Sequence, residues 1–276
     1  MCCSSPRRRG AQSGFGLASL FVACALAVGC PKPAVAPTPQ LMALPSDPQA
    51  LIALADASFA EPPDFQRAFA AASRAAELTP RDPGAAWRAA RGAFELADDT
   101  EDKDALLRYA RLGVTLAERA VGLAPNCGEC HYFLAVNLGL IARASTPSGA
   151  LELVKRVGLH ARKAVELAPD YLEAGPRRVL GLLLVRAPPW PTSIGDLDEG
   201  IKLLKTASER FPDNPLSRIF LAEAYMVDKK YEPAKNELRR VLGTPKQGMW
   251  GRIGGRWRRE ANKLLRRITV RERDDE

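Results

Sequence analysis

One short segment of the sequence carries residue types that could perform redox chemistry. Cys127 and Cys130 are separated by two residues, and His131 follows directly. A Cys-x-x-Cys-His segment is the attachment pattern of c-type haem. Two cysteines at this spacing also form a disulfide in an oxidising compartment, or serve as a reactive dithiol of the thioredoxin kind. The segment therefore leaves three chemistries open: haem attachment, a structural disulfide and thiol exchange.

The surroundings of this segment favour a disulfide between Cys127 and Cys130. The sequence has only two histidines, His131 and His160, so axial ligands for a haem iron are scarce. The segment also falls where a helical repeat is expected to begin, and His131 takes the position of a bulky packing residue there. No strand pattern of a thioredoxin-type sheet surrounds it. We therefore expect no cofactor, with haem c on Cys127, Cys130 and His131 as the alternative.

Other catalytic patterns are absent from the sequence. We find no Gly-rich phosphate loop, no Ser/His/Asp arrangement and no paired carboxylates with a matching base. Most acidic residues fall on predicted helix faces with Arg or Lys nearby, as they do on solvated surfaces. These absences predict a protein that is not an enzyme and holds no metal.

Cys30 ends a segment that is typical of a secretory signal. Residues 1–14 are polar and basic, and residues 15–29 form a weakly polar to apolar run that is short for a membrane span. The run ends Ala27-Val28-Gly29-Cys30, which resembles the lipobox of bacterial lipoproteins, although Ala27 stands where a leucine is usual. We predict a signal peptide over residues 1–29 and lipidation of Cys30. Cys24 is a second candidate, and an ordinary cleaved signal is the alternative.

The residues after Cys30 indicate where the chain is held. Pro31 follows the cysteine, and no Asp is present there to retain a lipoprotein in the inner membrane. The resemblance therefore implies an outer-membrane lipoprotein that faces the periplasm. Residues 30–46 contain five prolines, which favour an extended backbone at about 3.1 Å per residue. We expect this segment to tether a folded domain to its lipid.

Regularly spaced prolines organise the rest of the chain. Each follows a short helical segment, and they are 45, 44, 43 and 33 residues apart: Pro80, Pro125, Pro169, Pro212 and Pro245. Because proline stops a helix and an apolar helical pattern follows each one, the sequence predicts stacked helix pairs. The pattern resembles tetratricopeptide repeats over residues 47–245. Three spacings exceed the usual 34 residues by about ten, so we place insertions at Leu96–Asp104, Ala142–Gly149 and Arg186–Asp196.

Residues 246–276 are predicted to form a basic capping helix and tail. Apolar residues recur at helical spacing on one face of this segment: Trp257, Ala261, Leu264, Leu265 and Ile268. The fold class is thus an all-α tetratricopeptide-like solenoid of antiparallel helix pairs with a C-terminal capping helix. Residues 239–276 carry a net charge of +7, nearly all of the chain's +8, so a protein-wide nucleic-acid footprint is not expected. The basic face is suited to anionic lipid, another polyanion or the cell wall.

Partner-contacting residues are predicted from the repeat register. The first helix of each pair lines the groove of such a solenoid, which points to Arg88, Tyr132, Val136, Arg178 and Glu223. Trp190, between two prolines, is either a lid over a ligand or an anchor packed on a hairpin end, and we favour the anchor.

Two segments resemble a more specific family. They are Leu134–Leu140 and Ala174–Gly181, the second running on to the loop Pro-Trp-Pro-x-Ser-x-Gly-Asp at Pro189–Asp196. Together they resemble the lipoproteins associated with TRAP-type transporters, called the T component. That resemblance implies an all-helical, periplasmic, non-enzymatic protein that binds a small hydrophobic ligand or a solute-binding protein, sometimes as an oligomer. The alternatives are a haem electron-transfer protein and a structural lipoprotein of the cell envelope.

Overall fold

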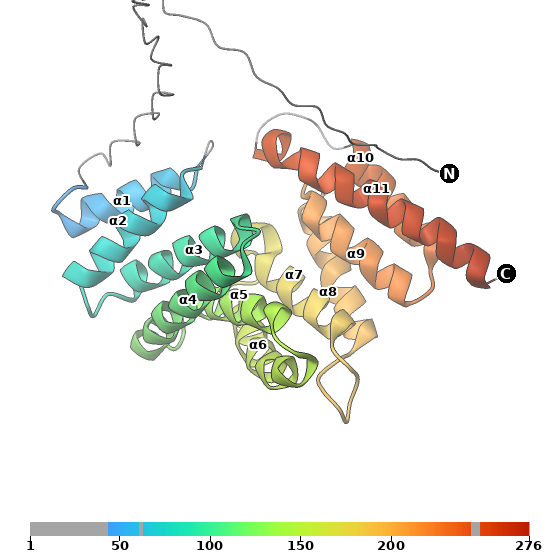
Figure 1. Ribbon diagram of the computed structural model, residues 1–276, viewed down its shortest axis with the longest axis horizontal. Helices are drawn as coiled ribbons and strands as arrows, with labels where there is room; N and C mark the ends of the chain where they lie inside the picture. The colour runs from blue at the N-terminus through green and yellow to red at the C-terminus, as the bar shows by residue number, and fades with distance from the viewer. Residues whose placement is uncertain (1–43, 61–62, 244–248, 276) are drawn as a thin grey trace, which may run out of the picture. The chain divides into compact units, whose positions relative to one another are not determined.

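The computed structural model describes residues 44–60, 63–243 and 249–275, and apart from an isolated bridge between Pro189 and Gly195 the regular elements of these residues are helices (Figure 1). The predicted all-α, tetratricopeptide-like solenoid is confirmed. The described elements follow in the order α1 (Pro48–Ser58), α2 (Phe65–Leu78), α3 (Pro83–Asp99), α4 (Lys103–Leu123), α5 (Gly128–Ala144), α6 (Pro147–Leu167), α7 (Tyr171–Arg186), α8 (Leu197–Arg210), α9 (Pro215–Val227), α10 (Tyr231–Gly243) and α11 (Met249–Asp275).

The spaced prolines end the second helix of each pair, as the sequence predicts. Helices α2, α4, α6 and α8 each stop two residues before one of them. In each case the residue before the proline still donates its N–H to a carbonyl one turn earlier, as Thr79 does to Ala75. Proline has no N–H with which to continue that ladder, so the chain turns there.

Polar residues begin the next helices. Asp82 accepts a hydrogen bond from the N–H of Gly84, and Asn214 accepts from Leu216 and Ser217. In both cases proline follows at the first helical position, where its missing N–H costs nothing. Asp196 caps α8 through the N–H of Glu199.

The extra length of the repeats is taken up mainly by longer helices. Helices α4 and α6 have 21 residues each. Helix α4 begins after Asp102, whose side chain accepts hydrogen bonds from the N–H groups of Asp104 and Ala105. Only the third predicted insertion forms an extended loop, between Arg186 and Leu197.

The helices form two layers. Each helix packs against its neighbours in sequence, and the odd-numbered helices also pack against one another: α1 with α3, α3 with α5, α5 with α7, α7 with α9, and α9 with α11. The largest core cluster is formed by residues of helices α3 to α7 and includes the fully buried Phe133, Leu138 and Leu180. The first helices of successive pairs therefore form one continuous layer along the solenoid.

Helix α11 covers the last helix pair. Ala261, Leu264 and Ile268 are buried against residues of α9 and α10, and Trp257 and Leu265 are half-buried beside them. The predicted apolar face and capping role are confirmed. Capping is needed because the final pair of a solenoid otherwise exposes an apolar surface.

The predicted signal peptide, Cys30 and most of the predicted tether lie outside the described residues. They therefore stay predictions. Among the helices that are described, none combines the length and apolar character that a membrane crossing requires.

Candidate functional site

Aromatic side chains from three successive helix pairs meet along the odd-numbered layer. Trp87 of α3 stacks on Phe133 of α5, with ring centroids 5.7 Å apart and planes within 3°. Tyr171, at the start of α7, meets the edge of Trp87 at 6.3 Å and of Tyr132 at 5.7 Å. Edge-to-face and offset stacked rings attract each other beyond simple burial, so these contacts lock three repeats together.

Charged side chains border these rings. The Arg88 guanidinium lies 4.3 Å from the Trp87 ring centroid, and its Nε donates to Asp56 at 2.8 Å. Arg91 stacks over Phe59 at 3.8 Å, and its Nε lies 3.9 Å from the Glu95 carboxylate. We call the resulting surface the helix-A face; it comprises Trp87, Arg88, Arg91, Glu95 and Tyr171, and the buried Tyr132 packs against Tyr171.

Burial changes the acid–base properties of this face. It raises the pKa of Glu95 to about 7, against the opposing charge of Arg91 and with help from Asp98 and Asp99. Burial also raises the pKa of the Tyr132 and Tyr171 hydroxyls. Glu95 therefore exchanges its proton near neutral pH, while both tyrosines remain neutral hydrogen-bond donors.

Arg178 holds a strained turn instead of facing a partner. Leu172, Glu173 and Ala174 all have positive φ, between 47° and 64°, a conformation that L-residues avoid. Pro176 has no N–H to offer the carbonyl of Leu172, and Arg178 Nη2 donates to that oxygen at 3.0 Å. Arg178 also donates to the carbonyl of Glu173.

The five predicted groove residues thus divide into two groups. Tyr132, Val136 and Arg178 are each less than 9% exposed, so they offer a partner little surface. Their side chains face inward because α5 and α7 are enclosed by neighbours on both sides. Arg88 and Glu223 are partly exposed, but each is engaged in an ion pair, with Asp56 and Arg186 respectively.

The favoured interpretation of Trp190 as a packed anchor is wrong. Its side chain is 84% exposed, at the tip of the loop between α7 and α8. Backbone contacts hold the loop instead: the N–H of Gly195 donates to Pro188, and that of Asp196 donates to Leu184. A Cβ at position 195 would lie 2.1 Å from the carbonyl oxygen of Ala187, so glycine is required there.

Cys127 and Cys130 are joined by a disulfide at the start of α5. Cys127 caps this helix, since its sulfur accepts the N–H of Cys130 at 3.1 Å. Both ring nitrogens of His131 are engaged, Nδ1 with His160 Nδ1 and Nε2 with the Pro125 carbonyl, each at 2.9 Å. Because the sulfurs are bonded to each other and Cys130 is fully buried, this arrangement does not fit haem attachment.

Arg91, Glu95 and Tyr171 were not identified from the sequence as contact residues. A signal for two of them exists, because Arg88, Arg91 and Glu95 are spaced three and four residues apart and so share one helical face. Nothing in the sequence reveals that Tyr171 meets Trp87 across two repeats. Within the described part of the chain, no three His, Cys, Asp or Glu side chains gather to form a metal site.

Comparisons with known proteins agree with the repeat architecture. A family model described as "Regulator of microtubule dynamics protein 1-3" matches residues 51–175, and a tetratricopeptide repeat model matches residues 195–247. The chain is 32% identical to "Regulator of microtubule dynamics protein 2" of Bos taurus and of Homo sapiens, in each case over 87 residues. This stretch is 30% of the chain and only 20% of either relative.

A solved structure supports the fold over a longer stretch. The crystal structure of a thermophilic tetratricopeptide protein from Thermus thermophilus is similar with a TM-score of 0.60 and 18% identity. The similarity covers 79% of this chain and 99% of that protein. The chain therefore has the fold of a tetratricopeptide-type solenoid, and neither family description names a reaction. Neither description refers to a TRAP-type transporter.

Proposed function

We propose that this chain is a non-enzymatic scaffold, anchored to a membrane through lipidated Cys30, that binds a protein partner on its helix-A face. The observation that carries the proposal is the convergence of Trp87 and Arg91 of α3 with Tyr171 of α7 onto one half-buried surface. Tryptophan, tyrosine and arginine are the residues that most often dominate binding energy at protein interfaces. A surface of this composition suits a polypeptide partner.

The charges on the helix-A face favour a polypeptide over a small apolar ligand. Arg88, Arg91 and Glu95 border the aromatic rings, and each has a side chain that is 18–24% exposed. A purely hydrophobic ligand would offer these groups no hydrogen bonds beyond the ion pairs they already make, whereas a peptide supplies both carbonyls and charged side chains. A small hydrophobic ligand remains the alternative occupant.

The proposed anchor rests on the sequence. A basic segment, an apolar run and small residues before Cys30 support export and acylation, and the proline-rich residues 30–46 support a tether. The proposed location is the periplasmic face of the outer membrane. An oxidising compartment of this kind is compatible with the disulfide at Cys127 and Cys130.

The resemblance to the T component family supports a narrower version of the proposal. In that version the partner is the solute-binding protein of a TRAP-type transporter. Regulation of microtubule dynamics is named for relatives of which the chain covers one fifth, and it does not enter the proposal.

Partner binding can be tested by crosslinking in intact cells, followed by mass spectrometry and affinity measurement with the purified partner. Replacing Arg88 and Arg91 together by alanine removes two charged groups from the helix-A face, so we expect the Kd to rise at least about tenfold. The matched control replaces Arg74 and Arg156, which also form ion pairs but lie on α2 and α6. Equal effects of the two double variants would reject the helix-A face as the binding site.

The anchor can be tested separately by fractionation and intact mass analysis. We expect a mature chain that begins at Cys30, carries an added acyl mass and sediments with membranes. Cys30→Ser should abolish the acyl mass, whereas Cys24→Ser should leave it unchanged. The reverse result would move the lipid to Cys24, and an unmodified soluble product would remove the anchor from the proposal.

A further inference from the structure

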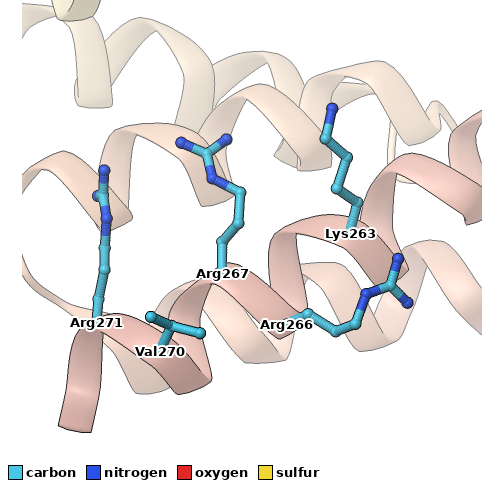
Figure 2. A pocket seen from close by; sticks show the side chains of 5 residues that line it. All are labelled: Lys263, Arg266, Arg267, Val270 and Arg271. Carbon is cyan, nitrogen blue, oxygen red and sulfur yellow. The ribbon is translucent and has the colours of Figure 1, made fainter. Parts of the chain in front are cut away.

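Helix α11 presents a row of basic side chains on its outer face. We call this row the α11 basic stripe; it comprises Arg259, Lys263, Arg266, Arg267 and Arg271, which are all exposed. Apart from the adjacent Arg266 and Arg267, these residues follow one another at intervals of three or four, which spreads them over one broad side of the helix. Two shallow hollows run along this side, and residues of the stripe make up four of the five that line one hollow and half of those that line the other. Figure 2 shows Lys263, Arg267 and Arg271 extending from α11 beside Val270, while Arg266 leaves in another direction.

The stripe is held rigidly from behind. Ala261, Leu264 and Ile268, on the opposite face of α11, are at most 1% exposed and pack against α9 and α10. This apolar face is occupied inside the protein and is not available to enter a bilayer. Any target of the stripe must therefore be recognised at its surface, through charge and hydrogen bonding.

Few acidic side chains lie near the α11 basic stripe. Of the two acidic residues between Gly255 and Arg273, Glu260 lies 3.6 Å from Lys263, and Glu272 binds Lys235 at 2.7 Å. Among the described residues, no carboxylate lies within ion-pair distance of Arg259, Arg266, Arg267 or Arg271. Four guanidinium groups thus remain available to an anion from outside the chain.

We propose that the α11 basic stripe docks the domain onto the phosphate groups of an anionic phospholipid surface. The planar guanidinium group binds phosphate through two parallel hydrogen bonds, and four of the five charged groups are arginines. Residues 259–271 span about 18 Å of helix, which is long enough to reach several neighbouring headgroups. A fluid lipid surface can arrange its phosphates to match a fixed row of charges.

The choice of a membrane over another polyanion rests on the proposed function, because the lipid anchor would keep the stripe close to a bilayer. A tethered site meets its target at a high effective concentration, so weak electrostatic contacts suffice. Each basic residue near an anionic surface contributes about fivefold to the partition coefficient. Docking would fix one face of the solenoid toward the lipid.

The test uses residues 30–276 with Cys30→Ser, which keep the whole compact unit Ala43–Glu276 but carry no lipid. We expect this chain to sediment with vesicles of phosphatidylglycerol and phosphatidylcholine, and not with phosphatidylcholine alone. Arg266→Gln, Arg267→Gln and Arg271→Gln together should lower binding by about 100-fold. Binding should also be lost at high salt, since exposed charges are screened.

The matched control removes the same charge from exposed residues on other helices, with Arg74→Gln, Lys155→Gln and Lys205→Gln. It should lower vesicle binding by no more than about threefold. Equal losses in both triple variants, absence of binding to the anionic vesicles, or tighter binding of duplex DNA or polyglutamate would overturn the proposal. None of these outcomes bears on acylation of Cys30 or on the helix-A face, which are tested separately.

Discussion

The charge of Glu95 is coupled to folding. Its pKa is about 7 in the folded chain, compared with an ordinary value of 4.5, because burial of the carboxyl outweighs the opposing charge of Arg91. Between these two pH values the folded state keeps a proton that the unfolded state has lost. The stabilising effect of that proton is complete below pH 4.5 and disappears as the pH rises through about 7.

We expect Glu95→Gln to be more stable than the unmodified chain at about pH 8.5, by about 1–3 kcal/mol, and similar to it at about pH 5. The lower end of this range allows for solvent screening, since the side chain is 24% exposed. Urea unfolding at both pH values measures the difference. Glu152→Gln, on the exposed side of α6, serves as the control. A pH-independent difference would show that Glu95 is ionised normally.

Close approach between helices depends on particular glycines. A Cβ at Gly181 of α7 would lie 3.0 Å from the carbonyl oxygen of Gly200 and 2.8 Å from a carbon of Leu204, both on α8. A Cβ at Gly139 of α5 would meet nothing within 4 Å. The same substitution therefore has opposite consequences at these two helical positions.

Gly181→Ala should lower the free energy of unfolding by about 1–3 kcal/mol, because α7 and α8 must separate. Gly139→Ala should raise it by up to about 1 kcal/mol, because alanine favours the helix and costs no contact. Chemical denaturation measures the change in the free energy of unfolding for both variants. If Gly181→Ala were as stable as the unmodified chain or more stable, the crossing of α7 and α8 would be looser than described.

At the scale of the whole molecule, stability is local. Contacts join each helix mainly to its neighbours in sequence and to the next helix of its own layer. Among the described residues, the longer-range contacts include the edge-to-face approach of Tyr171 to Trp87 and the weak approach of Arg256 to Asp98 at 3.8 Å. Solenoids of this kind lose order near the point of damage, while distant repeats persist. The terminal cover supplied by α11 should therefore matter most to α9 and α10.

Ending the chain after residue 248 removes α11 and uncovers apolar residues such as Ile219, Leu238 and Val241. We expect amide hydrogen exchange to rise at least about tenfold in α9 and α10 and to change little in α3–α6. Mass spectrometry of exchanging peptides measures both regions in one experiment. Uniform loss of protection would mean that the solenoid unfolds as a single unit.

The sequence by itself determined the repeat architecture and the capping helix. Proline ends a helix wherever it lies, and apolar residues at helical spacing require a covering partner, so Pro80, Pro125 and Leu264 act through local rules. The same local logic locates the basic stripe, because α11 is a single helix whose two faces are set by spacing.

Only the tertiary structure decided which residues of the odd-numbered layer are accessible. Tyr132 and Arg178 hold the register positions expected of contact residues, yet neighbouring helices and the turn at Leu172 enclose them. Trp190 is expected to pack on a hairpin end, but its side chain is exposed to solvent. Backbone hydrogen bonds of Gly195 and Asp196 hold the loop without it. Burial of a side chain depends on which distant segments of the chain pack against it. The spacing of residues along one helix does not reveal those segments.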